Sequence, residues 1–357
     1  VDIPSGIAGD TGAALGVATR ADLTVTFHAM KPGHVLMPGR RHSGEVVVVD
    51  IGLGADATAR ARLACDGPDL AVNDGRALLA RIGVDPDGHK YTKGHVLVLA
   101  GGLEGTGAAR LAARGALRSG AGLVTLGVPP SALMAHAGRG PDALMVRRAE
   151  GAAGLAALLA DRRRNVVVVG PAFGVGETTR AAVADILGAQ RPVVLDADAL
   201  TSFAGDAEGL AALTGANGRA VLTPHEGEYL SLFADHAPTQ QGGPVATLDA
   251  PAPSKLARAL SGAARMSAVM VLKGPDTVVA GPDGRAVIAC NAPPWLGTAG
   301  SRDVLAGPIG GLLAQGLPPY DAARAGVWLH GEAGRLAGRG LIADDLPEAV
   351  RQVFATF

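Results

Sequence analysis

The sequence has almost no net charge, and this absence limits its main partners. Its 32 Lys and Arg residues offset 33 Asp and Glu residues, which gives a formal charge of −1 at pH 7. A protein whose main partner is nucleic acid or an anionic membrane needs a basic surface, so we expect neither partner here. No apolar run approaches the roughly 18 residues that suggest a membrane span, and no signal peptide is recognisable. These absences predict a cytoplasmic globular protein.

Cysteine and aromatic residues are also scarce. Cys65 and Cys290 have no metal-ligand spacing and form no disulfide framework, which is typical of a reducing compartment. Glycine is abundant instead, with 52 residues, and it allows helices to lie close to a sheet and backbone to approach a ligand. The chain begins at Val1 without an initiator Met, so we expect it to be a fragment of a longer protein.

Short β-branched runs alternate with Ala- and Leu-rich helical segments. Such alternation predicts an α/β fold with a mostly parallel sheet covered by helices on both faces, and ligands bound at the carboxyl ends of the strands. The expected strands are Val46–Ile51, Val96–Ala100, Leu123–Val128, Val166–Gly170, Val193–Leu195, Ala220–Leu222, Val269–Leu272 and Thr277–Ala280. The expected helices are Ala108–Ser119, Gly154–Asp161, Thr178–Leu187, Ser254–Met266, Val304–Gln315 and Tyr320–Ala337.

Two segments interrupt this alternation. Residues 55–88 contain polar, Gly- and Pro-rich stretches, which predict a domain boundary. Residues 237–253 are rich in Gln, Pro, Gly and Thr, which predicts a mobile loop.

The most informative motif is residues 298–307, where small residues lead through Asp303 into an apolar helical run. A turn of small residues that opens a helix presents free backbone N–H groups and the positive end of the helix dipole to an anion. A carboxylate there suits a base that takes a proton from a hydroxyl about to receive a phosphoryl group. The alternative is that Asp303 merely caps the helix.

Several further strand ends carry polar or glycine-rich motifs. Residues 101–109 and 170–176 are glycine-rich loops between a strand and a helix, each either a ligand loop or an ordinary turn. Asp196 and Asp198 follow a buried strand at a spacing of two, where they either bind Mg²⁺ and a hydroxyl or cap the next helix.

Two more motifs follow later strands. His225, between Pro224 and Glu226, is either a site residue or a structural histidine. Lys273 lies in a tight turn and suits phosphate, or is a hairpin surface lysine.

In this order, the motifs resemble the bifunctional NAD(P)H-hydrate repair enzymes, in which an epimerase domain precedes an ADP- or ATP-dependent dehydratase domain. The resemblance implies that residues 89–357 are a dehydratase domain with a ribokinase-like fold, that residues 1–60 are the C-terminal fragment of a Rossmann-like epimerase domain, and that residues 61–88 are a linker. It also implies a hydro-lyase that restores NADH or NADPH from its hydrate, with Mg²⁺ as cofactor and a homo-oligomeric assembly.

The same resemblance assigns roles by position. It makes Asp303 the base at the substrate hydroxyl, and Ala108, Gly174 and His225 lining residues for the NAD(P)H-hydrate. The nucleotide would contact a loop composed of Lys273, Gly274, Pro275, Asp276 and Thr277, together with Arg302. Asp196 and Asp198 become candidates for organising Mg²⁺.

For the N-terminal fragment, the resemblance places Asp2 at the hydrate and Ser5 at a K⁺ ion that serves the epimerase. The Asn-Asn-Gly-Gly-Asp loop that the epimerase requires is missing, so we expect no epimerase activity from this chain.

The sequence departs from the family pattern at its most informative motif. Gly-Thr-Gly-Asp is replaced by Gly-Ser-Arg-Asp at 300–303, and Pro308 falls within the following helix. If position 302 requires a positive φ, arginine there costs about 1–2 kcal/mol, and its guanidinium either pairs with Asp303 or grips phosphate. If Pro308 lies past the first turn, we expect it to kink the helix at a cost of about 3 kcal/mol.

Two alternative functions therefore remain open. One is another ribokinase-like kinase that phosphorylates a small alcohol. The other is a nucleotide-binding relic disabled by Arg302.

Overall fold

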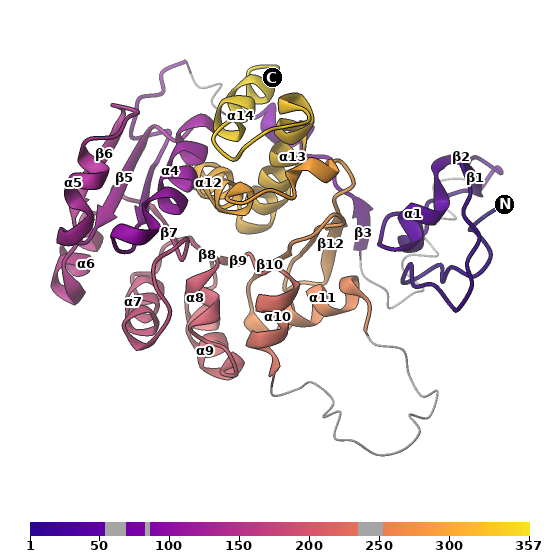
Figure 1. Ribbon diagram of the computed structural model, residues 1–357, viewed down its shortest axis with the longest axis horizontal. Helices are drawn as coiled ribbons and strands as arrows, with labels where there is room; N and C mark the ends of the chain where they lie inside the picture. The colour runs from indigo at the N-terminus through magenta and orange to yellow at the C-terminus, as the bar shows by residue number, and fades with distance from the viewer. Residues whose placement is uncertain (54–68, 83–85, 235–252) are drawn as a thin grey trace.

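A ten-stranded sheet forms the centre of the molecule, with a small N-terminal lobe at one end (Figure 1). The computed structural model describes residues 1–53, 69–82, 86–234 and 253–357.

The strand order in this sheet is β3-β12-β11-β10-β9-β8-β7-β4-β5-β6. Within the described residues, β11 alone runs antiparallel to its two neighbours. The central strands are apolar and fully buried, as a sheet covered on both faces requires. The strands are β3 Asp69–Val72, β4 His95–Leu99, β5 Leu123–Val128, β6 Leu144–Arg148, β7 Val166–Val169, β8 Val193–Leu195, β9 Ala220–Leu222, β10 Val269–Leu272, β11 Val278–Ala280 and β12 Arg285–Ile288.

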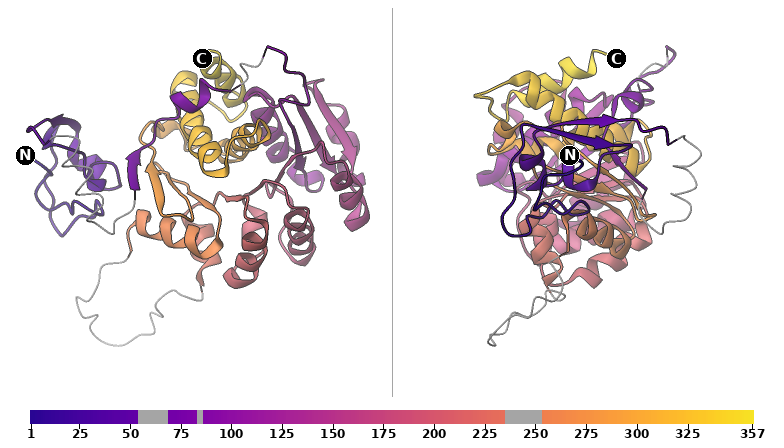
Figure 2. Two further views of the ribbon diagram at one scale, coloured as in Figure 1. Left: turned by 180° about the vertical axis from the view of Figure 1, so that it is seen from behind. Right: turned by 90° about the vertical axis from the view of Figure 1, so that its right-hand side faces the viewer.

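Helices cover the two faces of the sheet as separate layers (Figures 1 and 2). One layer contains α4 Thr106–Arg118, α12 Ser301–Ala314, α13 Pro319–Ala337 and α14 Leu346–Phe354, with the short α3 Arg76–Leu79 against α13. The other contains α6 Gly151–Ala160, α7 Glu177–Gly188, α8 Asp198–Thr201, α9 Ala207–Asn217, α10 Glu226–Leu232 and α11 Lys255–Met266. The short α5 Leu133–Ala137 packs beside β6. Each layer has its own apolar core against the sheet.

Helices α4 and α12 pack closely because α12 carries small residues where the two meet. A Cβ on Gly307 would lie 2.1 Å from the carbonyl oxygen of Ala112, so only glycine fits there. Gly300 precedes α12 with φ +83°, which favours glycine. Pro308 lies past the first turn of α12, the position at which the sequence analysis expected a kink. The helix nevertheless continues through Pro308 to Ala314.

The N-terminal lobe contains a two-stranded parallel sheet, β1 Leu23–Phe27 and β2 Glu45–Val49, and the short helix α1 Gly39–Ser43. It lies beyond the β3 end of the large sheet (Figures 1 and 2). Strand β3, which falls within the segment expected as a linker, pairs with β12 of the large sheet.

The structure confirms the expected fold class and each expected strand and helix, with ends shifted by a few residues. The sequence analysis did not predict β1, β3, β6 or β12, nor the helices α1, α5, α8, α9, α10 and α14. The expected loop at 237–253 lies outside the described residues except for Pro253. No helix in the described ranges is long and apolar enough to cross a bilayer.

Candidate active site

A buried ion pair joins the carboxyl ends of neighbouring strands. Asp196 follows β8, Thr223 follows β9 and Lys273 follows β10, so parallel pairing brings all three to one edge of the sheet. The Lys273 ammonium lies 2.5 Å from Asp196 Oδ1, and the Thr223 hydroxyl donates to the same oxygen at 2.7 Å. Asp196 and Lys273 are 1% and 6% exposed. The second carboxylate oxygen of Asp196 is buried without a partner among the described residues, so it remains available to a ligand.

Asp303 faces this ion pair across a cavity of about 400 Å³. The cavity is lined by Asp196, Ala197, His225, Glu228, Lys273, Arg302, Asp303 and residues 296–300. Burial and the negative charge of Asp196 raise the pKa of Asp303 to about 6, although Lys273 opposes the shift. A carboxylate with this pKa suits proton transfer near neutral pH.

The alternative that Asp303 caps α12 does not describe its environment. The N-cap residue is Gly300, with no side-chain capping bond, and Asp303 accepts no hydrogen bond from the described parts of the chain. Its desolvated, unpaired carboxylate is instead what a general base requires.

The first turn of α12 is held from behind by a histidine that sequence reasoning missed. The ring Nε2 of His330, on α13, lies 2.9 Å from the Ser301 carbonyl oxygen. Burial lowers the pKa of His330 to about 4, so the ring is neutral and donates this bond. Nothing in the sequence distinguishes it from an ordinary buried histidine, because its partner is on another helix.

His225 caps a helix and also borders the Asp303 cavity, while its role toward a substrate stays a prediction. Its Nδ1 accepts the backbone N–H groups of Gly227 and Glu228 at 3.0 and 3.3 Å, so it caps α10. Glu228 returns a bond to the backbone N–H of His225 at 2.8 Å. The His225 side chain also lines the Asp303 cavity, so capping fixes its position in the site.

A second cavity of about 520 Å³ adjoins the first, and the two share His225, Lys273 and Arg302 as lining residues. Four cationic side chains line it, those of Lys255, Arg258, Lys273 and Arg302, against the two acidic residues Glu226 and Asp276. Lys255 pairs with Asp276, Arg258 with Glu226 and Lys273 with Asp196, so among the described residues Arg302 brings the unpaired positive charge that suits a phosphate.

The turn predicted to contact a nucleotide lies at this second cavity. Gly274, Pro275 and Asp276 line it, and the Thr277 hydroxyl closes the turn by donating to the Gly274 carbonyl at 2.8 Å. Lys255, which sequence reasoning missed, donates to Asp276 at 2.8 Å. As the sequence predicted, the turn connects two adjacent strands, β10 and β11.

Arg302 is exposed and has helical backbone, because the positive φ of this turn belongs to Gly300. The strain considered for position 302 is therefore absent. Within the described ranges, Arg302 makes no hydrogen bond or ion pair, and hence none to Asp303. Because it borders both cavities, its guanidinium is available to a ligand.

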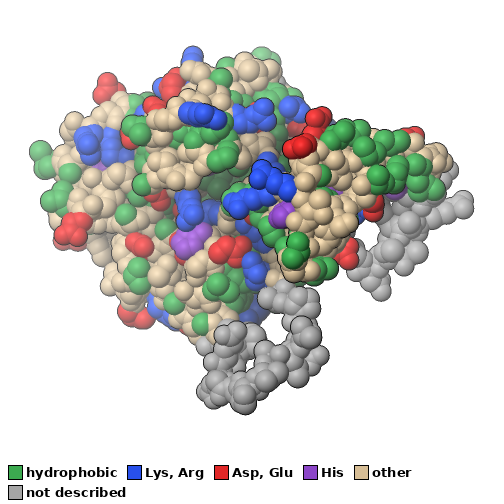
Figure 3. Space-filling model, turned by 45° about the vertical axis from the view of Figure 1, so that its right-hand side comes forward, with side chains coloured by type: hydrophobic (Ala, Val, Ile, Leu, Met, Phe, Trp, Pro, Cys, Tyr) green, Lys and Arg blue, Asp and Glu red, His purple; other side chains and the backbone are tan. Residues whose placement is uncertain are grey.

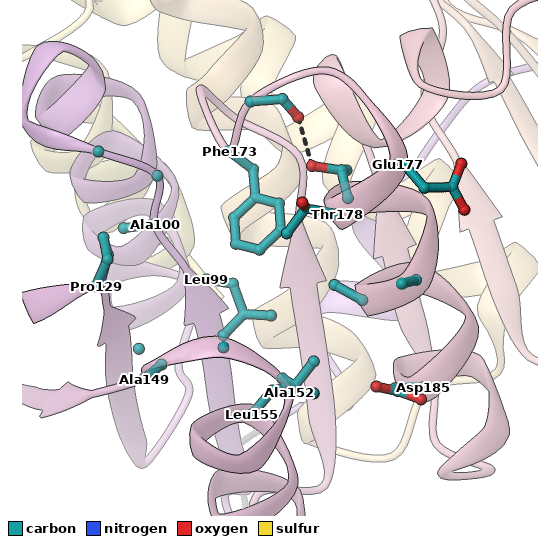
Figure 4. A pocket seen from close by; sticks show the side chains of 18 of the residues that line it. Leu99, Ala100, Pro129, Ala149, Ala152, Leu155, Phe173, Glu177, Thr178 and Asp185 are labelled. Atoms are coloured by element: carbon teal, nitrogen blue, oxygen red, sulfur yellow. Dashed lines mark hydrogen bonds between the residues drawn. The ribbon is translucent and has the colours of Figure 1, made fainter.

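A third cavity, of about 710 Å³, lies where the strand order reverses between β4 and β7. Ligands of doubly wound sheets bind at such switch points. Its walls are mainly apolar, and the Phe173 ring projects into it (Figure 4). Gly174 lines this cavity, whereas Ala108 lines none of the cavities described above.

The structure gives different surroundings to Asp196 and Asp198, which the sequence proposed together for Mg²⁺ or a hydroxyl. Asp198 accepts the backbone N–H of Gly174 at 2.8 Å and does not line the Asp303 cavity, whereas Asp196 does. Among the described residues, no group of three or more His, Cys, Asp or Glu side chains is arranged to hold a metal.

Asp2 and Ser5 lie in the N-terminal lobe. The Asp2 carboxylate contacts the Lys31 ammonium and accepts the Thr26 hydroxyl at 2.9 Å, and these bonds lower its pKa. Ser5 is exposed, and its carbonyl accepts the backbone N–H of Thr19.

The raised pKa of Asp303 predicts a pH-dependent effect of Asp303→Asn on stability. The folded state binds the Asp303 proton more tightly than the unfolded chain does, so ionisation destabilises the fold as pH rises from about 4 to 6. At pH 7 we expect Asp303→Asn to raise the free energy of unfolding by about 1–3 kcal/mol, and at pH 4 to change it little. Urea denaturation at both pH values measures this.

The exposed carboxylate of Asp142 provides the control, since Asp142→Asn should change stability little at either pH. Equal effects of Asp303→Asn at pH 4 and pH 7 would contradict the raised pKa.

Family comparisons match this site and the N-terminal lobe separately. Residues 96–352 match the model described as NAD(P)H-hydrate dehydratase, and residues 1–33 match that of the YjeF-related protein N-terminus. The bifunctional NAD(P)H-hydrate repair enzyme of Thermofilum pendens is 36% identical over all of this chain and 67% of its own length. That of Salinibacter ruber is 38% identical over 99% of this chain and 65% of its own length. The chain thus spans about two thirds of the length of these relatives.

Solved structures agree with the fold. The ADP/ATP-dependent NAD(P)H-hydrate dehydratase of Bacillus subtilis, co-crystallised with ATP and Mg²⁺, superposes with a TM-score of 0.63 at 26% identity, covering 79% of this chain and 97% of its own. A ribokinase-like protein of Enterococcus faecalis has a TM-score of 0.65 at 22% identity, covering 81% of this chain and 96% of its own, which supports the ribokinase-like fold alone. The dehydratase model covers more than half of the sequence, and the chain therefore belongs to the NAD(P)H-hydrate dehydratase family.

Proposed function

We propose that this chain catalyses the ADP- or ATP-dependent dehydration of NAD(P)H-hydrate to NAD(P)H. One observation carries the proposal: the Asp303 carboxylate, with a pKa of about 6, faces a cavity that shares three lining residues with a cationic cavity suited to a nucleotide. A base beside a phosphate site is the arrangement that phosphoryl transfer to a hydroxyl requires.

Asp303 takes the proton of the substrate's ring hydroxyl as that oxygen attacks the terminal phosphorus of the nucleotide. The new O–P bond forms and the bond to the leaving nucleotide breaks, which releases AMP from ADP or ADP from ATP. The C–O bond then breaks with its electron pair on the departing phosphate, and loss of a proton from the neighbouring ring carbon restores the double bond. The net reaction removes water from the hydrate, with phosphate and AMP or ADP as the other products.

Lys273 and Arg302 are the cations that border both cavities, so we assign them to the phosphates. Mg²⁺ would accompany the nucleotide and neutralise charge on its phosphates, as is usual for this ion. The free, buried oxygen of Asp196 fits a magnesium-bound water or the ion itself. Asp198 is occupied by Gly174, so we assign it the role of positioning that loop.

The apolar cavity at the switch point between β4 and β7 suits the rest of the dinucleotide substrate. We assign Gly174 and His225 to the substrate, at the larger cavity and the Asp303 cavity respectively. Ala108, on the first turns of α4, remains a prediction that rests on the resemblance.

We propose no epimerase reaction for this chain. Asp2 is paired with Lys31 in a half-exposed ion pair, and Ser5 stays a K⁺ ligand by resemblance alone.

The proposed function predicts recovery of NADH absorbance when the chain and Mg²⁺ are added to purified NADH-hydrate with ADP or with ATP. Asp303→Asn should reduce the rate by at least about a hundredfold, because the hydroxyl proton then has no acceptor. Asp142→Asn is the control and should leave the rate unchanged. Phosphorylation of a small alcohol without NADH recovery would favour the kinase alternative.

A separate prediction concerns the affinity for the nucleotide and the role of Arg302. Because it borders both cavities without a protein partner, we expect Arg302→Gly to raise the KM for the nucleotide by about 10- to 100-fold through loss of a charge-assisted hydrogen bond. Arg302→Lys, which keeps the charge, should have a smaller effect. An inactive native chain that Arg302→Gly activates would instead identify a relic disabled by this arginine.

A further inference from the structure

The N-terminal lobe is hydrogen-bonded to the turn at the cationic cavity. The backbone N–H of Met37 donates to Asp276 Oδ2 at 2.8 Å. The guanidinium of Arg40, on α1, donates to the Pro275 carbonyl at 3.1 Å and to the Cys290 carbonyl. These bonds connect residues more than 230 positions apart in the sequence.

Asp276 is fixed from two sides as a result. Its Oδ1 accepts the Lys255 ammonium at 2.8 Å from within the main body, and its Oδ2 accepts Met37 from the lobe. The side chains of Asp276 and Lys255 are 6% and 9% exposed. A buried carboxylate with a donor on each oxygen has a single orientation, so the lobe helps to determine the shape of the 274–277 turn.

The lobe also forms part of the cavity wall. Thr11, Ala13, Met37 and Pro38 line the same 520 Å³ cavity as the four cations. Together with Pro253 and Pro275 they form a mostly apolar part of the lining, distinct from the cationic side chains. Figure 3 shows Lys, Arg and His side chains gathered beside the hollow where the lobe meets the main body.

We infer that the epimerase-derived lobe is a working part of the dehydratase nucleotide site. Met37 and Pro38 form a wall for the nucleoside end of ADP or ATP. Arg40 is a positioning residue that holds the 274–277 turn in place. This inference rests on the proposed function for the identity of the nucleotide. The lobe therefore acts on nucleotide affinity, whereas the proposed base, Asp303, and the phosphate-binding Lys273 belong to the main body.

The test is Arg40→Ala in the full chain, with Arg41→Ala as the matched control because Arg41 is exposed on the same short helix. Arg40→Ala should raise the KM and the Kd for ADP by about tenfold, the effect of losing one to two hydrogen bonds. The rate at saturating ADP and the KM for NADH-hydrate should change much less. Arg41→Ala should match the native chain in all four quantities.

A second measurement does not depend on turnover or on any variant. ADP should slow hydrogen exchange of the backbone amides of Met37 and of residues 39–41 in the native chain, because the nucleotide contacts this wall and stabilises the bond from Met37 to Asp276.

The outcomes separate this inference from the proposed function. The inference alone would be overturned if the native chain turned over NADH-hydrate, Arg40→Ala left the affinity for ADP unchanged, and ADP gave no protection of residues 37–41. No turnover, with ADP binding that still weakens in Arg40→Ala and still protects residues 37–41, would overturn the proposed function and leave the inference standing.

Discussion

The buried ion pair between Asp196 and Lys273 is the interaction on which the rest of the site depends. It joins residues that follow β8 and β10, with Thr223 of the intervening strand end bonded to the same carboxylate oxygen. Removing one partner of such a pair leaves an uncompensated buried charge, which is strongly destabilising. The pair also sets the chemistry opposite it, because Asp196 raises and Lys273 lowers the pKa of Asp303. The buried contact therefore holds the ends of these strands together and also affects the pKa of the proposed base, Asp303.

The second constraint is the position of α12, which carries Asp303 to this edge. Gly307 permits α12 to lie against α4, and the Ser301 carbonyl is held by His330. With the first turn of α12 held in this way, the carboxylate of Asp303 makes no capping hydrogen bond within the described residues. Arg302 causes no backbone strain, because the left-handed residue of the turn is Gly300. The ion pair joins residues 77 positions apart, and α12 packs against α4 from much earlier in the chain, so neither arrangement is local.

The sequence was sufficient to predict the alternating strands and helices and the edge of the sheet at which the polar residues gather. Short, near-continuous apolar runs such as β7 and β10 are typical of buried strands. The polar residues that follow them lie on one edge of the sheet because the strands are parallel. The sequence could not separate Asp196 from Asp198, because their spacing places both near the edge and only the tertiary fold gives Asp198 to the Gly174 backbone. His330, Lys255 and Arg40 were missed for a related reason: their partners are distant in the sequence, and no spacing or composition marks such pairs. The strands β6 and β12 were missed because each has charged residues at one end.

The central claim is that Asp303 acts as the base in its desolvated, ionised form. The most direct test is the pH dependence of kcat for NADH-hydrate dehydration at saturating nucleotide. The account predicts that kcat falls as pH decreases through about 6, because protonated Asp303 cannot accept the hydroxyl proton. A kcat that stays level from pH 7.5 to pH 5, in protein that remains folded over this range, would contradict it.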